Sequence, residues 1–304
     1  MRVDGRDAAA VADAAKRLAA GELVAFPTET VYGLGARADD DAAVAKIFAL
    51  KGRPTGHPLI VHVADRIEAE RFGVISPLAE RLVGAFWPGP VTVIVRRLPG
   101  VAEAAAAGQA TIGLRCPAHP IAHALLGAAR DAGHVIEEFG EDLLVLDGGA
   151  AQLGIESAIV DCSRDRPALL RPGVLTRERI EAVLGAPLAG ADIAAPRAPG
   201  TLEAHYAPRA RLRLMSTQML RTALEVLGSD PLKLAVYSRS VPSGVATGVR
   251  HRRMPARPEQ AAHELFAVLR ELDNDGVHLI WVEEPPPGPE WDGVRDRLSR
   301  AAAT

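Results

Sequence analysis

The stretch ELVAFPTETVYGLGARA, residues 22–38, passes from an apolar run into a segment with two closely spaced glycines. Its first part, ELVAFPT, is rich in apolar residues and predicts a strand. Gly33 and Gly35, followed by Ala38, match the G-x-G-x-x-A pattern of dinucleotide-binding proteins. That pattern also requires an acidic residue about 20 positions further on, and residues 53–60 read RPTGHPLI. We therefore assign the glycines to a tight turn and set the dinucleotide fingerprint aside.

On both sides of this stretch, short β-branched runs alternate with longer helical patterns, which is typical of an α/β protein. The sequence predicts helices at 8–20, 41–50, 76–86, 118–130, 135–139 and 176–185. It predicts strands at 22–28, 58–63, 91–97, 111–117, 143–147 and 156–162. Thr176 is the expected N-cap of the last helix and Gly185 its stop residue. We expect residues 1–185 to form a domain with a twisted mixed sheet, flanked by helices around a basic concave cleft.

The pattern changes after residue 185. Residues 186–210, APLAGADIAAPRAPGTLEAHYAPRA, are rich in proline and glycine and show no apolar period, which is typical of a linker. Residues 211–304 then alternate again, with strand-like runs RLRLM, LKLAVYS and VHLIWVE and helical patterns at 217–227, 258–272 and 291–302. This predicts a smaller Rossmann-like α/β domain with three layers and a mostly parallel sheet.

The chain has 304 residues, of which 48% are apolar and 24% charged. This composition is typical of a soluble globular protein and excludes wholesale disorder. The 35 Lys and Arg residues against 38 Asp and Glu residues give a net charge of −3, which argues against a polybasic surface for nucleic acid. No apolar run reaches the roughly 18 residues that cross a bilayer, and the N-terminal residues lack the apolar core of a signal peptide. We expect a cytoplasmic protein with no membrane partner.

The two cysteines, Cys116 and Cys162, lie in apolar strand-like runs without a metal-binding motif around them. Their surroundings indicate small buried residues of a protein from a reducing compartment. A single disulfide between the two remains an alternative at this stage.

Several cations fall at expected strand ends. Pro54 disfavours a helical conformation at Arg53, so Lys51-Gly52-Arg53 is expected to be extended, with Lys51 and Arg53 on one face. The same alternation places Thr111 and Arg115 on one face of TIGLRCP.

Arg115 and Arg171 each stand among apolar residues, where a charge is costly to bury unless an anion meets it. For either arginine alone, pairing with a carboxylate of the protein is the simpler interpretation. Four cations at strand ends of one domain favour a polyanionic ligand, because guanidinium groups match phosphate and carboxylate oxygens. Thr28 and Thr30, two apart after Pro27, share a face as well.

Three weaker patterns have simpler explanations. His119 and His123 are four apart on an expected helix, but no Cys, Asp or Glu nearby completes a metal site. The basic run 249–254 could contact RNA, although a solvated edge strand explains it better. No G-x-x-x-x-G-K-[ST] motif occurs, so ordinary P-loop chemistry is excluded.

Six ordered motifs give the chain a family resemblance. They read LVAFPTETVYGLGA, KGRP…HPLIVHVAD, FWPGPVTVIV, TIGLRCPAHP, LDGG…GIESAIVD and LLRPGVLT. Together they closely resemble the YrdC-domain family. The motif APG…HYAP and the C-terminal α/β pattern resemble its long, two-domain form, the threonylcarbamoyl-AMP synthases.

The resemblance implies a nucleotidyltransferase that uses ATP with Mg²⁺, L-threonine and bicarbonate to make threonylcarbamoyl-AMP and pyrophosphate. In the family, a tRNA-modifying transferase complex uses this adenylate to form threonylcarbamoyladenosine in tRNA. It implies neither a covalent nucleophile nor an assigned acid or base, and no metal ligand among the protein side chains. Catalysis would rest on positioning and on neutralising phosphate charge.

Carried over onto this chain, the family's pattern implies two sets of site residues. The threonine positions are Thr30, His62, Arg115 and Ser157. The ATP positions are Arg53, His57, Thr111, Arg171 and Tyr206, with Lys51 as a further phosphate cation. Tyr206 lies in the expected linker. Two roles are open for it: it belongs to a lid that the linker forms over the cleft, or it packs the linker against a domain.

The chain departs from the family's pattern in two places. A strand and loop reading roughly P-x-A-A-P-S-A-N is missing between the helix at 118–130 and the LDGG motif, a loss we estimate at about 20 residues. Ala158 also stands where the family usually has threonine. A native deletion and an error in the sequence record would look alike. Because the missing segment supplies contacts in the family, we expect impaired activity in this chain.

These departures keep other functions open. One alternative is a non-catalytic relative that binds a nucleotide or, weakly, RNA. A carbamoyltransferase of the hydrogenase-maturation type shares the domain, but it carries an extra N-terminal domain and Cys-rich zinc segments, which two cysteines cannot supply.

Overall fold

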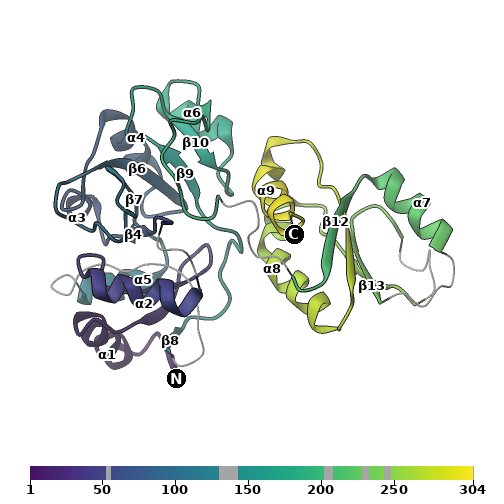
Figure 1. The fold of residues 1–304 in the computed structure, drawn as a ribbon, viewed down its shortest axis with the longest axis horizontal. Coiled ribbons are helices and arrows are strands. Elements are labelled where there is room, and N and C mark those ends of the chain that lie inside the picture. The colour runs from purple at the N-terminus through teal and green to yellow at the C-terminus, as the bar shows by residue number, and fades with distance from the viewer. Residues whose placement is uncertain (53–55, 130–142, 202–207, 228–232, 243–247, 304) are drawn as a thin grey trace. The chain divides into compact units, whose positions relative to one another are not determined.

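The computed structural model describes residues 1–52, 56–129, 143–201, 208–227, 233–242 and 248–303 (Figure 1). The chain divides into two compact units, Met1–Thr201 and Leu202–Thr304. Residues 186–201, which the sequence suggests as the start of a linker, therefore belong to the first unit. The expected helix at 135–139 lies outside the described residues.

The stretch at 22–38 forms an antiparallel hairpin of β2 (Val24–Pro27) and β3 (Tyr32–Gly35). Gly33 and Gly35 pair with β2 inside β3, so their assignment to a tight turn is wrong. The turn lies earlier, because the Thr28 hydroxyl donates to the Val31 carbonyl oxygen at 2.6 Å and so closes the chain on itself.

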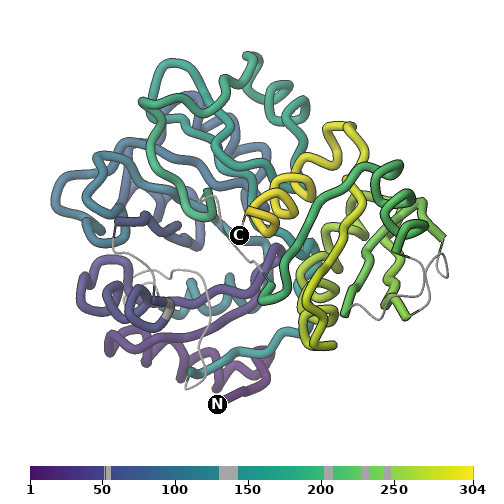
Figure 2. Tube along the Cα trace, turned by 45° about the vertical axis from the view of Figure 1, so that its right-hand side comes forward, coloured from purple at the N-terminus to yellow at the C-terminus, as the bar shows by residue number. Residues whose placement is uncertain are grey.

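This hairpin belongs to a four-stranded sheet. Its order is β1 (Arg2–Asp4), β8 (Leu144–Asp147), β2 and β3. β8 pairs in parallel with both β1 and β2, which brings the LDGG motif beside the N-terminal strand (Figure 2). β2 therefore has a hydrogen-bonded neighbour on each side.

Two helices, α1 (Ala8–Ala19) and α5 (Pro120–Ala128), pack together on this sheet. Their apolar faces form one core with Phe26 and Leu146, and the side chains of Leu18 and Leu125 are fully buried in it. Burial of such side chains contributes about 1.5–3 kcal/mol each.

The second sheet of the first unit is seven-stranded and mixed. Its main path runs β11 (Ala189–Gly190), β10 (Ala168–Arg171), β9 (Ala158–Asp161), β6 (Val91–Arg97), β7 (Thr111–Arg115) and β4 (Ile60–His62), and β5 (Gly73–Val74) pairs with β6. The pair β6–β7 is antiparallel and β6–β9 is parallel. The mixed α/β class is thus confirmed, but the strands form two sheets instead of the expected single one. The sequence also missed β1, β3, β5, β10 and β11, which are short or rich in glycine and charge.

The remaining helices of this unit begin and end at local signals. They are α2 (Asp41–Lys51), α3 (Arg66–Ala69), α4 (Pro77–Phe86) and α6 (Arg177–Leu184). Thr176 caps α6 and Gly185 ends it, as predicted. The expected extended run at Lys51-Gly52 is wrong. Lys51 ends α2, and Gly52 takes the left-handed conformation at φ +60° because its N–H donates back to the Ala49 carbonyl oxygen.

The second unit is a parallel sheet between two helical layers. The strand order is β12 (Arg211–Met215), β15 (Leu279–Glu283), β13 (Leu234–Ser238) and β14 (Arg250–Arg253). α7 (Thr217–Leu227) covers one face, and α8 (Pro258–Asn274) and α9 (Asp292–Ala301) cover the other (Figure 1). The prediction of three layers with a parallel sheet is confirmed.

The alternation along β13 explains these layers. Leu234 and Val236 lie on one face of β13 and join the core with α7. Tyr237 lies on the opposite face, and its hydroxyl donates to Glu264 of α8 at 3.0 Å. β14 is an edge strand, as predicted for the basic run, and Arg250 pairs with Glu271 at 3.2 Å. Within the described ranges, none of the helices combines the length and apolar character that crossing a membrane requires.

Candidate functional site

A buried ion pair lies at the carboxyl end of β7. Arg115 is fully buried, and its Nη2 donates to Glu29 Oε1 at 2.8 Å and to the Thr30 hydroxyl at 2.8 Å. The other Glu29 carboxylate oxygen accepts the backbone N–H of Ala118 at 2.9 Å. Glu29 therefore ties the turn after β2 to the chain that leaves β7.

The simpler interpretation of Arg115, a carboxylate partner within the protein, is thus correct for one edge of its guanidinium group. The sequence analysis singled out the threonines on either side of Glu29 and missed Glu29 itself. A signal was present, because an acidic residue in an apolar run has to find a partner if the run is buried. Glu29 is 5% exposed.

The rest of the Arg115 guanidinium group has no hydrogen-bond partner among the described residues. Nε and Nη1 are buried and make no hydrogen bond in the described part of the chain. Together they carry three N–H donors. Buried donors without acceptors cost free energy, about 1–3 kcal/mol each, so this arrangement suits a site that an anionic group completes.

His62 lies directly beside this group. It ends β4 and stands level with Arg115 in the parallel pair of β4 and β7. The side chain is fully buried, and its ring meets the Phe26 ring edge-on with centroids 6.1 Å apart. The structure therefore brings Thr30, His62 and Arg115 together.

A second polar group lies at the start of β9. The Ser157 hydroxyl is 2.8 Å from the Thr92 hydroxyl and accepts from Arg171 Nη2 at 3.2 Å. Arg171 Nη2 and Nε also donate to the Ser157 carbonyl oxygen at 2.9 and 3.1 Å. All three residues are buried, and Thr92 is one that the sequence analysis missed.

The two groups share one face of the seven-stranded sheet. In the antiparallel register of β6 and β7, Ile94 pairs with Gly113 and Val93 with Leu114, so Thr92 falls level with Arg115. Side chains at paired positions lie on the same face. The residues predicted for threonine, together with Arg171, thus gather on that face near the carboxyl ends of β4 and β7.

The predicted ATP positions are less completely defined. Thr111 is half-buried and lies on the same face as Arg115, but at the opposite end of β7, about 13 Å along the strand. His57 is half-buried in the segment before β4. Lys51 ends α2, and Arg53 and Tyr206 lie outside the described residues.

Residues 186–201 run beside these positions. The Arg197 N–H donates to the Gln109 side chain at 2.8 Å, and its guanidinium group donates to the Gly56 carbonyl oxygen at 2.5 Å. Ala198 packs on the apolar part of the sheet face, and Arg171 Nη1 donates to the Pro199 carbonyl oxygen at 3.0 Å. The sequence analysis missed these contacts because a proline- and glycine-rich segment shows no period.

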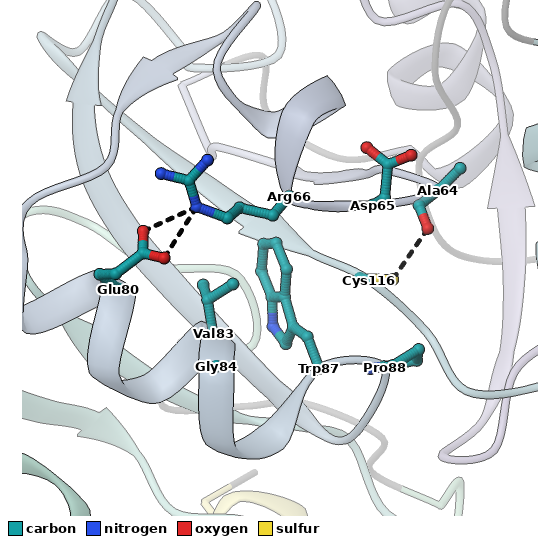
Figure 3. Close-up of a pocket in the computed structure, with 9 residues that line it drawn as sticks. All are labelled: Ala64, Asp65, Arg66, Glu80, Val83, Gly84, Trp87, Pro88 and Cys116. Atoms are coloured by element: carbon teal, nitrogen blue, oxygen red, sulfur yellow. Dashed lines mark hydrogen bonds and ion pairs between the residues drawn. The ribbon is translucent and has the colours of Figure 1, made fainter.

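A separate cavity of about 270 Å³ lies next to Cys116 (Figure 3). Trp87 is one of the residues that line it, and in Figure 3 it lies between the ion pair of Arg66 and Glu80 and the side chain of Cys116. Cys116 follows Arg115 on the chain and therefore faces away from the site just described. Burial raises the pKa of the Cys116 thiol to about 12, which makes it unreactive.

The described residues contain no group of three or more His, Cys, Asp and Glu side chains that could hold a metal ion. His119 instead caps α5 by accepting the Ile121 N–H on Nδ1 at 3.2 Å. His123 Nε2 lies 3.7 Å from Cys116 Sγ. Both cysteines are buried, as predicted, and they are free, so the alternative of a disulfide between them is wrong.

The structure is that of a two-unit α/β protein with buried guanidinium and hydroxyl groups gathered on one face of the seven-stranded sheet. A family model described as telomere recombination matches residues 16–173, and one described as the C-terminal domain of threonylcarbamoyl-AMP synthase matches residues 175–303. The chain belongs to the threonylcarbamoyl-AMP synthase family, in its two-domain form.

Individual relatives extend over nearly the whole chain. The threonylcarbamoyl-AMP synthase of Bacillus subtilis is 34% identical over 320 aligned positions, which cover 96% of this chain and 92% of the relative. That of Pyrococcus abyssi is 35% identical and covers 93% of this chain and 91% of the relative. A crystal structure of the Pyrococcus abyssi protein with L-threonine matches 99% of this chain and 97% of that chain, with a TM-score of 0.86 and 30% identity.

Proposed function

We propose that this chain makes threonylcarbamoyl-AMP from ATP, L-threonine and bicarbonate and releases pyrophosphate. Its relatives carry the name of this synthase, and one of them is known in complex with L-threonine. The observation in this structure that supports the proposal most is Arg115, whose Nε and Nη1 are buried and have no hydrogen-bond partner in the part of the chain that the structure describes. Buried guanidinium N–H donors of this kind fit the oxygens of an anionic ligand such as a carboxylate.

The threonine part of the site follows from that contact. The carboxylate of threonine meets Arg115, and the hydroxyl groups of Thr30 and Ser157 lie on the same face to receive polar groups of the amino acid. The amine adds to the carbon of bicarbonate and forms a carbamate, with loss of water. A carbamate oxygen then attacks the α-phosphorus of ATP, and pyrophosphate leaves with the electron pair of the broken P–O bond.

The chain supplies positioning and charge to this reaction. Arg171, held in place through Ser157, offers a fixed positive charge that fits the phosphates. We assign the phosphate contacts also to Lys51, Arg53, His57, Thr111 and Tyr206. Mg²⁺ enters this proposal as the counter-ion of ATP. The product would pass to a tRNA-modifying transferase complex, in the cytoplasm.

The direct test is pyrophosphate release from ATP in the presence of bicarbonate, with and without L-threonine. The proposal predicts release that depends on threonine, and calorimetric titration should show binding of both threonine and ATP. Binding of neither substrate would refute it.

We further propose that turnover is impaired by the missing Ser-Ala-Asn segment. The alignment to the Bacillus subtilis synthase spans 320 positions, more than the 304 residues of this chain, so positions of the relative have no counterpart here. Inserting the relative's segment between Ala129 and Leu143, in place of residues 130–142, should raise the rate of pyrophosphate release. An equally long glycine and serine insertion is the control, and no gain over it would refute impairment.

The same observation favours a second candidate, a relative that binds a nucleotide without turnover. It predicts ATP binding by the natural chain and no threonine-dependent pyrophosphate. The insertion experiment separates the two, because restored turnover shows that the rest of the catalytic machinery is intact.

A further inference from the structure

The buried pair of Glu29 and Arg115 carries an inference that rests on the proposed threonine site and deepens it. Both side chains are buried, at 5% and 0% exposure, and their charged atoms are 2.8 Å apart. Among the described residues, Glu29 is the one carboxylate that pairs with Arg115. The positive charge that would receive an anionic ligand is therefore already balanced.

This balance decides which ligand the site accepts. A ligand that carries a carboxylate and no positive charge would leave the neutral pair with one uncompensated negative charge in a buried place, which is costly. A zwitterion brings its own ammonium group, so the Glu29–Arg115 pair and its ligand together carry no net charge. Arg115 without Glu29 would show the opposite preference.

We propose that Glu29 is a positioning residue that makes the site select a zwitterionic amino acid over a simple carboxylate. It acts through Arg115 in two ways. Its charge neutralises the guanidinium group, and its bond to the Ala118 N–H fixes the guanidinium group so that Nε and Nη1 remain free for the ligand.

Glu29→Gln tests the charge with little change in the size and shape of the side chain. Glutamine keeps one oxygen that accepts from Arg115 Nη2 and removes the negative charge, but its amide nitrogen cannot accept the Ala118 N–H. The ligands are L-threonine and its deamino analogue, β-hydroxybutyrate of the same configuration, which has the carboxylate and hydroxyl but no ammonium group. Calorimetric titration of both into the full-length chain gives the ratio of their affinities.

The natural chain should bind threonine more tightly than β-hydroxybutyrate, and Glu29→Gln should lower that ratio by about tenfold or more. If the role of Glu29 is merely structural, Glu29→Gln should weaken the binding of both ligands alike and leave the ratio of their affinities unchanged. That result would overturn the inference. Glu283→Gln is the matched control. It removes another fully buried carboxylate, in the second unit, and should leave the ratio as it is.

Two further measurements keep the test decisive. Glu29→Asp retains the charge and should retain the preference for threonine. If Glu29→Gln does not fold, as circular dichroism would reveal, the natural chain decides, since equal affinity for both ligands would overturn the inference. If the natural chain binds no threonine, both the proposed function and this inference fail. If it binds threonine and Glu29→Gln keeps the ratio, this inference fails alone.

Discussion

Arg171 holds Ser157 in place through both of its oxygens. Nη2 donates to the carbonyl oxygen at 2.9 Å and to the hydroxyl at 3.2 Å, and Nε donates to the same carbonyl oxygen at 3.1 Å. Nη1 donates to the Pro199 carbonyl oxygen at 3.0 Å. One guanidinium group thereby joins β10, the start of β9 and the segment that follows α6.

Replacing Arg171 by lysine should disturb this junction, because a single ammonium group cannot make all these bonds at once. For Arg171→Lys we expect a loss of about 1–3 kcal/mol in the free energy of unfolding and about tenfold weaker ATP binding. Thermal unfolding and ATP titration measure the two effects. Arg166→Lys, at an exposed position on the connection between β9 and β10, is the control and should change neither. An unchanged melting temperature for Arg171→Lys would contradict the prediction.

Gly200 should not tolerate a side chain. It has φ +65°, and a Cβ atom there would lie 2.5 Å from Arg171 Nη1. We expect Gly200→Ala to destabilise the chain by about 1–3 kcal/mol, because both the backbone and the guanidinium group would be strained. Gly190→Ala is the matched control in the same segment, since nothing lies within 4 Å of its Cβ position. Equal thermal stability of the two variants would show that the contact is unimportant.

Both cysteines should resist thiol reagents in the folded protein. Burial raises the pKa values of Cys116 and Cys162 to about 12, so the reactive thiolate is scarce near neutral pH. Ellman's reagent should detect no thiol in the native chain and both thiols in guanidinium chloride. A fast-reacting native thiol would mean that one of these side chains is accessible.

The stability of the first unit should fall as the pH drops below the ordinary pKa of histidine. Burial lowers the pKa of His119 below 6.5, and its Nδ1 must stay unprotonated to accept the Ile121 N–H. The unfolded chain binds a proton near pH 6.5 and the folded chain only at lower pH. The stabilisation is therefore complete above about pH 6.5 and is lost as the pH falls toward the folded pKa.

His119→Asn checks this dependence, because asparagine also caps helices but does not titrate. The melting temperature of the variant should vary less with pH than that of the natural chain. Some dependence should remain, because burial also lowers the pKa of His251 in the second unit. Identical pH profiles of variant and natural chain would exclude His119 as a source.

Much of the architecture could be predicted because its signals are local. The boundaries of α6 follow from Thr176 and Gly185, and the layers of the second unit follow from the alternation of apolar runs. Short strands such as β1 and β11 could not be predicted, because two or three residues carry no period. The prediction of a tight turn at Gly33 and Gly35 was wrong because glycines that permit a turn can equally lie in a paired strand.

The sequence by itself determined which residue types were available for an anion, and on which strand Arg115 would lie. Only the tertiary structure decided that Arg115 meets Glu29, 86 positions away, and that Ser157 meets Thr92, 65 positions away. The physical reason is that a buried charge or hydroxyl must find its partner among whatever the pairing register brings level with it. That register is set by the packing of whole sheets, which no local pattern along the chain contains.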